Sequence, residues 1–239
     1  MIVSPLSKPI RPSSVVDVIH QRVRDEILKG EHAPGAMLRQ EDIANRLGVS
    51  KIPLREAFSR LQSEGFVILR PRRGYVVKQF DIDEIREIFD LRAIIEDHGG
   101  RLAAVERTDE DVAGVMQLIE DMTKLDPFGP DYYLQWTDCN DRFHGAILQA
   151  CRRQHVIKAA EQMRHMLLPY VRRYSTMPWA GHEVGREHHQ LAAALAAGDG
   201  HLLGTLSAAH CYHSRDKLIA NIIAAGDHPL PGAKAASAS

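Results

Sequence analysis

Cysteine is scarce in this sequence, and its distribution excludes two classes of small domain. The 239-residue chain has three cysteines, Cys139, Cys151 and Cys211, which lie far apart and show no paired spacing. A cysteine-rich zinc finger or a disulfide framework requires such pairs, so neither is expected. The pattern is typical of a protein kept in a reducing compartment.

Long apolar runs are also missing. No stretch approaches the roughly 20 apolar residues that cross a bilayer. Prolines and basic residues interrupt the first twelve positions, where a signal peptide would need an apolar core. We therefore expect a cytoplasmic protein with no membrane partner.

Signatures of catalysis are absent as well. The sequence has no His-Glu-x-x-His motif and no nucleophile elbow, and no serine or cysteine has a recognisable base partner. A general base would have to be recruited from Asp138, Asp141 or Glu187, none of which has a diagnostic spacing. We expect a protein that is not an enzyme, and a metalloenzyme is the least favoured alternative.

What the sequence does have is a charge asymmetry along the chain. Residues 1–79 carry 14 lysines and arginines against 8 acidic residues, whereas the remaining 160 residues carry 16 against 23. A basic first third joined to an acidic remainder indicates a nucleic-acid-binding module followed by a regulatory module. A chance split of solvated charges would look the same, so motifs have to decide between the two.

Apolar residues in the basic third recur with helical spacing. Three helices are predicted, over residues 14–29, 40–47 and 51–64. Ser14 with Asp17 is suited to cap the first helix, and Ser50 to cap the third. Gly48 provides the tight turn between the second helix and the third.

Two strand-like runs follow, Phe66–Leu69 and Tyr75–Val77, joined by an arginine-rich turn. The order helix, helix, turn, helix and basic hairpin is that of a winged helix-turn-helix. The start of its third helix would meet base edges in the major groove, while other basic groups would meet phosphates or a minor groove. The expected DNA-binding residues are Arg39, Ser50, Lys51, Arg55, Arg60, Arg72, Arg73 and Gly74.

The stretch LRQEDIANRLGVSKIPLREAFSRLQSEGFVILRPRRGYVV, residues 38–77, resembles the DNA-binding domain of the GntR family. Its most specific part is the pattern GVS-x-x-P-x-REA. Arg55 matches an arginine of that family, whereas Lys51 stands where arginine is common. Lysine cannot make the forked contact to guanine that arginine makes, so the resemblance implies DNA binding without fixing the operator sequence.

The remaining two thirds of the chain are predicted to be helical throughout. Apolar residues recur at intervals of three and four, with breaks near residues 108–109, 126–130, 177–178 and 198–200. Six or seven helices would form a bundle with cavities between them. The expected fold is therefore mainly α: a winged helix-turn-helix over residues 13–78 and an all-helical domain over 81–226, with a flexible N-terminus (1–12) and a disordered tail (227–239).

Four residues of the helical region stand out as candidate metal ligands. Asn140 and His144 are four apart and share a helical face, while His188 and His210 lie in two later amphipathic stretches. Imidazoles from facing helices can converge on one cation. Spacing alone indicates this weakly, because the chain has 13 histidines and most histidines in proteins bind no metal.

This region resembles the FCD ligand-binding domain of the FadR-type branch of the GntR family. The resemblance is carried by LRAIIE at 91–96, NDRFH at 140–144 and the segment from EHHQLAAALAAGD to His210. It implies a divalent metal ion, zinc or nickel, held by Asn140, His144, His188 and His210. Asn140 replaces the commoner aspartate, which weakens the site and leaves more positive charge for an anionic ligand. His189 and His213 remain alternative ligands.

The same resemblance implies that Arg92 points into an effector cavity and holds a small carboxylate by two parallel hydrogen bonds. From the residues alone, Arg92 could equally form a salt bridge with Glu96 one turn away. The expected protein is a homodimeric repressor on a palindromic DNA operator, with an affinity set by a small organic acid. The alternative is a regulator whose helical domain only dimerises and holds no metal.

Overall fold

The computed structural model describes residues 14–71, 74–79, 81–129, 131–174 and 182–226. The chain divides into two compact units, the first built from residues up to 27 with 35–78 and the second from residues 28–34 with 79 onward. The fold is mainly helical with one small sheet, which confirms the expected fold class. Arg72, Arg73, the N-terminal stretch 1–12 and the tail 227–239 lie outside the described residues.

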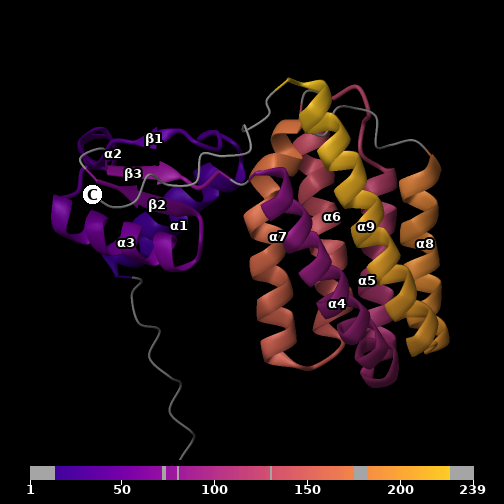
Figure 1. Ribbon diagram of the computed structural model, residues 1–239. Coiled ribbons are helices and arrows are strands. Elements are labelled where there is room, and N and C mark those ends of the chain that lie inside the picture. Colours follow the sequence, from indigo (N-terminus) through magenta and orange to yellow (C-terminus); the bar gives the residue numbers. More distant parts are fainter. Residues whose placement is uncertain (1–13, 72–73, 80, 130, 175–181, 227–239) are drawn as a thin grey trace, which may run out of the picture. The chain divides into compact units, whose positions relative to one another are not determined.

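The first unit contains three helices and three short strands (Figure 1). They are α1 (Val15–Leu28), β1 (Met37–Leu38), α2 (Gln40–Leu47), α3 (Lys51–Ser63), β2 (Val67–Arg70) and β3 (Gly74–Val77). Ser14 and Asp17 exchange hydrogen bonds at the start of α1, as their spacing predicts. Gly48 ends α2 with a φ of 65°, a conformation that costs glycine little.

The start of α3 differs from the prediction. Ser50 occupies the N-cap position with extended backbone, but its hydroxyl makes no capping hydrogen bond. An N-cap side chain accepts from the second or third N–H of the helix, and here the third helical residue is Pro53, which has none. The Ser50 hydroxyl, on an exposed residue, therefore stays available to other donors and acceptors.

The wing is a three-stranded antiparallel sheet in the order β1-β3-β2. Leu69 pairs with Tyr75 and Arg70 with Gly74 across the β2–β3 hairpin, and Met37 pairs with Val76 on the other side. The strand β1 is two residues long, which is too short to give an alternating pattern in the sequence. On the inner side Tyr75 stacks on Phe58 of α3, with ring centroids 4.7 Å apart, and so fixes the wing to the third helix.

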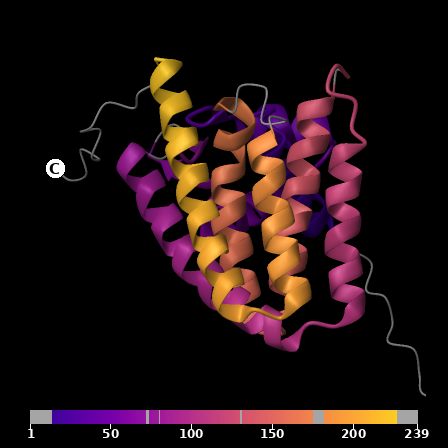
Figure 2. The ribbon, with the colours of Figure 1, turned by 90° about the vertical axis from the view of Figure 1, so that its right-hand side faces the viewer.

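The second unit is a bundle of six helices in the part of the chain that the structure describes (Figure 2). They are α4 (Ile82–Glu106), α5 (Asp109–Thr123), α6 (Tyr132–Gln149), α7 (Gln154–Tyr174), α8 (His182–Ala197) and α9 (Gly200–Ala224). Two apolar clusters form its core, one around Phe143, Leu195 and Leu203 and one around Phe89 and Leu167. Across the described ranges, no helix combines the length and apolarity that a membrane span requires.

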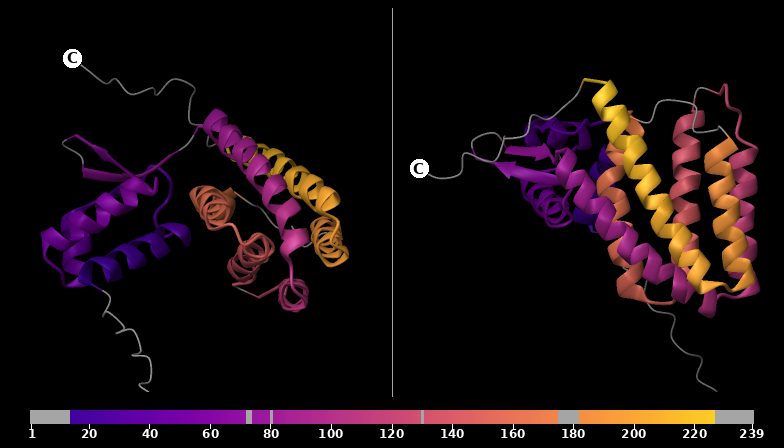
Figure 3. Two further views of the ribbon diagram at one scale, coloured as in Figure 1. Left: turned by 90° about the horizontal axis from the view of Figure 1, so that it is seen from below. Right: turned by 45° about the vertical axis from the view of Figure 1, so that its right-hand side comes forward.

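The helices α4 and α9 run side by side at unusually close range (Figure 3). Gly100 and Gly204 face each other there, and a Cβ added to Gly100 would lie 3.3 Å from the Cα of Gly204. A Cβ added to Gly204 would lie 2.7 Å from the carbonyl oxygen of Asp97. Backbone contact of this kind requires glycine, because any side chain would push the two helices apart.

One break between helices was not predicted. The chain leaves α6 at Gln149 and enters α7 at Gln154, where the sequence CRRQ contains neither glycine nor proline. Arg152 makes the turn with a φ of 55°, the one non-glycine residue with positive φ among those described. Its guanidinium donates to Asp111 of α5 at 2.5 Å and to the carbonyl of Gln149, which helps to hold the strained backbone.

Candidate functional site

The expected DNA-contacting residues of the first unit differ in whether their side chains form ion pairs within the protein. The side chains of Arg39 and Arg55 are exposed and form no hydrogen bond or ion pair within the described residues. Lys51 instead pairs with Glu41 of α2, with 2.9 Å between Nζ and Oε1, and Arg60 pairs with Asp17 of α1 at 2.5 Å. Exposed ion pairs of this kind contribute little to stability, so both basic groups can exchange their partner for a phosphate or a base.

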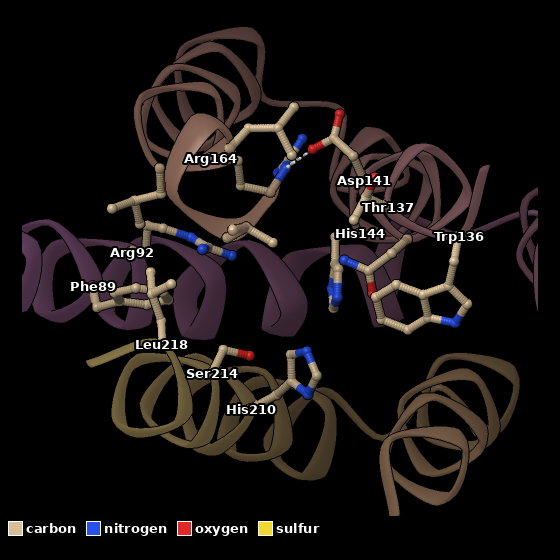
Figure 4. A pocket seen from close by; sticks show the side chains of 14 residues that line it. Phe89, Arg92, Trp136, Thr137, Asp141, His144, Arg164, His210, Ser214 and Leu218 are labelled. Atoms are coloured by element: carbon tan, nitrogen blue, oxygen red, sulfur yellow. Dashed lines mark hydrogen bonds and ion pairs between the residues drawn. The ribbon is translucent and has the colours of Figure 1, made fainter. Parts of the chain in front are cut away.

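A cavity of about 700 Å³, counting the part open to solvent, lies inside the helical unit (Figure 4). Its lining comes from four of the helices, α4, α6, α7 and α9, and combines apolar side chains with a polar group of two arginines, two histidines, an amide and a carboxylate. The lining residues are Phe89, Arg92, Trp136, Thr137, Asn140, Asp141, His144, Arg164, Leu167, Leu168, Val171, His210, Ser214 and Leu218.

Three histidines meet at one end of this cavity. His144 on α6, His188 on α8 and His210 on α9 each offer a ring nitrogen, and these nitrogens lie within 4.8 Å of one another. All three residues are buried, with 2–6% of their surface exposed. His189 is exposed and His213 is not in the cluster, so the geometry selects His188 and His210 from the two neighbouring alternatives.

The surroundings keep two of these imidazoles neutral. Burial, together with the neighbouring histidines, holds the pKa of His144 well below its ordinary value. Burial likewise lowers the pKa of His188 to about 3. A neutral imidazole has a lone pair to donate and is the form that binds a metal ion.

Unpartnered polar atoms test whether a metal ion fits. Nε2 of His188 and Oδ1 of Asn140 are buried and have no hydrogen-bond partner among the described residues. Buried polar atoms in proteins are almost always satisfied, so two orphans beside a histidine cluster point to a ligand that would use them. The residues present therefore fit a divalent cation, with three imidazoles and the amide oxygen as its donors.

Glu187 forms a hydrogen bond with one histidine of the cluster, His210, and with the neighbouring His213. Its two carboxylate oxygens bind Nδ1 of His210 at 2.6 Å and Nδ1 of His213 at 2.8 Å. These hydrogen bonds lower the pKa of Glu187 to about 2, so it is ionised at neutral pH. The sequence did not mark this role, although the position of Glu187 directly before His188 is a signal that could have suggested it.

Two buried arginines define the other side of the cavity. Arg92 on α4 is 7% exposed and donates from Nε and Nη2 to Oε1 of Glu96, at 3.1 and 2.9 Å. The salt bridge and the cavity position, which the sequence left as alternatives, therefore occur together. Figure 4 shows Arg92 and Arg164 pointing into the same space, opposite His144 and His210.

Arg164 on α7 was not among the predicted site residues. Its Nε donates to Oδ1 of Asp141 at 3.0 Å, while its Nη1 is buried and has no acceptor in the part of the chain that the structure describes. Burial alone would raise the pKa of Asp141, but His165 and Arg164 lower it well below its ordinary value, so the ion pair is charged. A buried N–H of a guanidinium without an acceptor indicates a place for an anionic group.

A winged helix-turn-helix followed by a helical domain with an internal polar cavity defines the class of DNA-binding transcriptional regulators. Comparison with known families agrees. The model of the bacterial regulatory proteins of the gntR family matches residues 16–77, and the FCD domain matches residues 87–213. The chain belongs to the GntR family, and its helical unit is an FCD domain.

Named relatives are regulators rather than enzymes. The chain is 30% identical over 144 residues to the HTH-type transcriptional regulator BphR of Paraburkholderia xenovorans, a match covering 58% of each chain. It is 29% identical over 154 residues to the transcriptional repressor GlaR of Escherichia coli, which covers 64% of this chain and 68% of that one.

Solved structures show the same fold. McbR/YncC of E. coli superposes with a TM-score of 0.72 at 24% identity, over 90% of this chain and 98% of that one. A putative GntR regulator from Rhodococcus sp. RHA1 gives 0.73 at 20% identity, over 87% and 98%. These similarities support the two-part architecture.

Proposed function

We propose that this regulator responds to a small organic acid bound in the cavity of its FCD domain, and that it does so with a divalent metal ion. One observation carries the proposal: two buried arginines and two buried histidines line a single cavity, and these histidines form a buried cluster with His188. Among the described residues, Nη1 of Arg164 is buried without an acceptor, and an unsatisfied guanidinium N–H is costly, so the cavity favours an anionic occupant.

The metal ion, zinc or nickel, would be held by His144, His188, His210 and Asn140. When bound, it would supply positive charge and open coordination positions for an oxygen ligand. Because all four donors are neutral, the charge of the ion would not be cancelled by its ligands. This donor set favours an effector that brings a carboxylate.

The arginines would bind and orient that effector. Glu96 fixes one edge of the Arg92 guanidinium, and Asp141 fixes the Nε of Arg164. The unpartnered Nη1 of Arg164 can then donate to a carboxylate oxygen without rearrangement of the side chain. The apolar lining from Phe89, Leu167 and Leu218 fits the carbon skeleton of such an acid.

At the level of the assembly, we propose a homodimer that places two α3 helices on the half-sites of a palindromic operator. Arg39, Ser50, Lys51, Arg55 and Arg60 are the proposed contacts of the described residues, together with the wing at Gly74, Arg72 and Arg73. An effector that binds one arrangement of the dimer better than another shifts the population and thereby the affinity for DNA. Release of the operator on effector binding would make the protein a repressor.

Metal analysis of the purified protein tests the proposal first. Protein prepared without chelators is expected to contain one divalent ion per chain, and His144→Ala is expected to lose it. A thermal-shift screen of organic acids, with and without chelator, should then find acids that raise the Tm only of the metal-loaded protein. A metal-free protein that still dimerises and binds DNA would instead support a purely structural FCD domain.

A further inference from the structure

Three different side chains are exposed where the first turn of α3 meets the first turn of α2. Lys51 begins the helix and Ile52 follows it with 73% of its surface exposed. Glu41 comes from the first turn of α2, and its Oε1 lies 2.9 Å from Nζ of Lys51. The lysine and glutamate side chains are 64% and 72% exposed, so nothing in the unit buries this group.

The helix-turn-helix places this turn against base edges in the major groove. Lys51 was expected there from the sequence, whereas Glu41 was not. A carboxylate beside DNA is repelled by the phosphates, so it lowers affinity unless it faces a hydrogen-bond donor. The major groove offers such donors only on bases, as the amino groups of cytosine and adenine.

The ion pair selects between those two bases. The Lys51 ammonium lowers the pKa of Glu41, so the carboxylate is ionised near neutral pH and can only accept hydrogen bonds. A G·C pair displays two acceptors on guanine and one donor on cytosine in the major groove. The Lys51 ammonium can donate to the guanine acceptors, and the neighbouring Glu41 carboxylate can accept from the cytosine amino group.

We propose that Glu41 and Lys51 read one G·C base pair in each half-site, with Lys51 on guanine and Glu41 on the amino group of cytosine. Glu41 is thus a specificity-determining residue that no motif assigns. Ile52 completes the turn as an apolar contact for a neighbouring thymine methyl group.

The test is a binding-site selection from random duplex DNA with the full chain, followed by competition measurements at one fixed salt concentration. Glu41→Gln is the variant, and Asp42→Asn is its matched control. Both remove one exposed carboxylate from the first turn of α2, but among the described residues Lys51 forms its ion pair with Glu41 and not with Asp42. Both variants are expected to bind all DNA more tightly, because each removes one repulsive charge.

Only Glu41→Gln is expected to lose discrimination at one base pair, by roughly five-fold to thirty-fold against non-cytosine bases. Adenine should gain most, because an amide can pair with adenine. Lys51→Met is expected to relax the guanine preference at the same base pair. The proposal fails if Glu41→Gln keeps the wild-type base preferences, or if it and Lys51→Met affect different base pairs. Melting temperatures of the variants show whether the unit remains folded.

Discussion

Nδ1 of His210 lies 2.6 Å from a carboxylate oxygen of Glu187, and the same imidazole belongs to the cluster of three buried histidines. Histidines that bind metals in proteins commonly have such a partner, which fixes the tautomer and the angle of the ring. The contact links a residue that lines the cavity to one that does not.

Glu187→Ala is therefore expected to weaken metal binding by about 10-fold to 100-fold, because His210 loses its orienting partner. A competition titration against a coloured chelator measures the change. His213→Ala is the control, since it removes the other partner of Glu187 and leaves the contact with His210 intact. Equal affinities of Glu187→Ala and wild type would contradict the role given to Glu187.

Replacement of Arg164 should separate effector binding from metal binding. Combined Arg164→Met and Asp141→Asn substitutions remove the cavity guanidinium without leaving its carboxylate partner ionised. We expect the metal content to stay and the affinity for the effector acid to fall about 10-fold to 100-fold, the usual loss for a charge-assisted hydrogen bond. Calorimetry with an acid that stabilises the wild type measures the affinity, and elemental analysis measures the metal content. An unchanged affinity would show that Arg164 does not contact the effector.

The close approach of α4 and α9 predicts a large effect of one methyl group. Gly204→Ala would place a Cβ 2.7 Å from a backbone oxygen of α4, and we expect the free energy of unfolding to fall by about 1–3 kcal/mol. Gly114→Ala, at a helical glycine of α5 with open space around it, should instead raise it by about 0.5–1 kcal/mol. Urea denaturation of both variants gives the comparison, and effects of the same sign would refute the packing argument.

Asp111 should contribute to the loss of stability in acid. Burial alone would raise its pKa, but hydrogen bonds from Thr108 and Arg152 outweigh burial and lower it below the ordinary value of 3.8. Its contribution is thus complete above the ordinary pKa and is lost as the pH falls through the lowered one. Urea unfolding between about pH 5 and pH 3 should show a shallower decline for Asp111→Asn than for the wild type. Parallel curves would contradict this assignment.

The sequence predicts the helices whose bounds are set by residues within the same segment of the chain. The apolar spacing and Gly48 predict α2 with the bounds that the structure shows, and α1 within one residue at each end. The turn at Arg152 could not be found in this way, because it uses positive φ without glycine and depends on Asp111 from another helix. The strand β1 exists only through its pairing with β3, so its two residues carry no pattern of their own.

The candidate site likewise has one part that local sequence predicts and another that depends on how the helices pack. A four-residue spacing places Asn140 and His144 on one helical face, and this follows from helix geometry alone. The meeting of His144 with His188 and His210 depends on how three helices pack, and spacing does not contain that information. Arg164 looks like one of many basic residues in an amphipathic helix, and only the packed bundle shows it as a buried group with an unused donor.

The glycine contact between α4 and α9 also determines which walls of the cavity can move. Helices already in backbone contact cannot come closer, so Arg92 on α4 and His210 on α9 form a wall of fixed spacing. Asn140, His144 and Arg164 belong to α6 and α7, which pack through side chains. We therefore expect any change in the width of the cavity to come from α6 and α7, so that the size of the proposed effector would set the displacement of that helix pair.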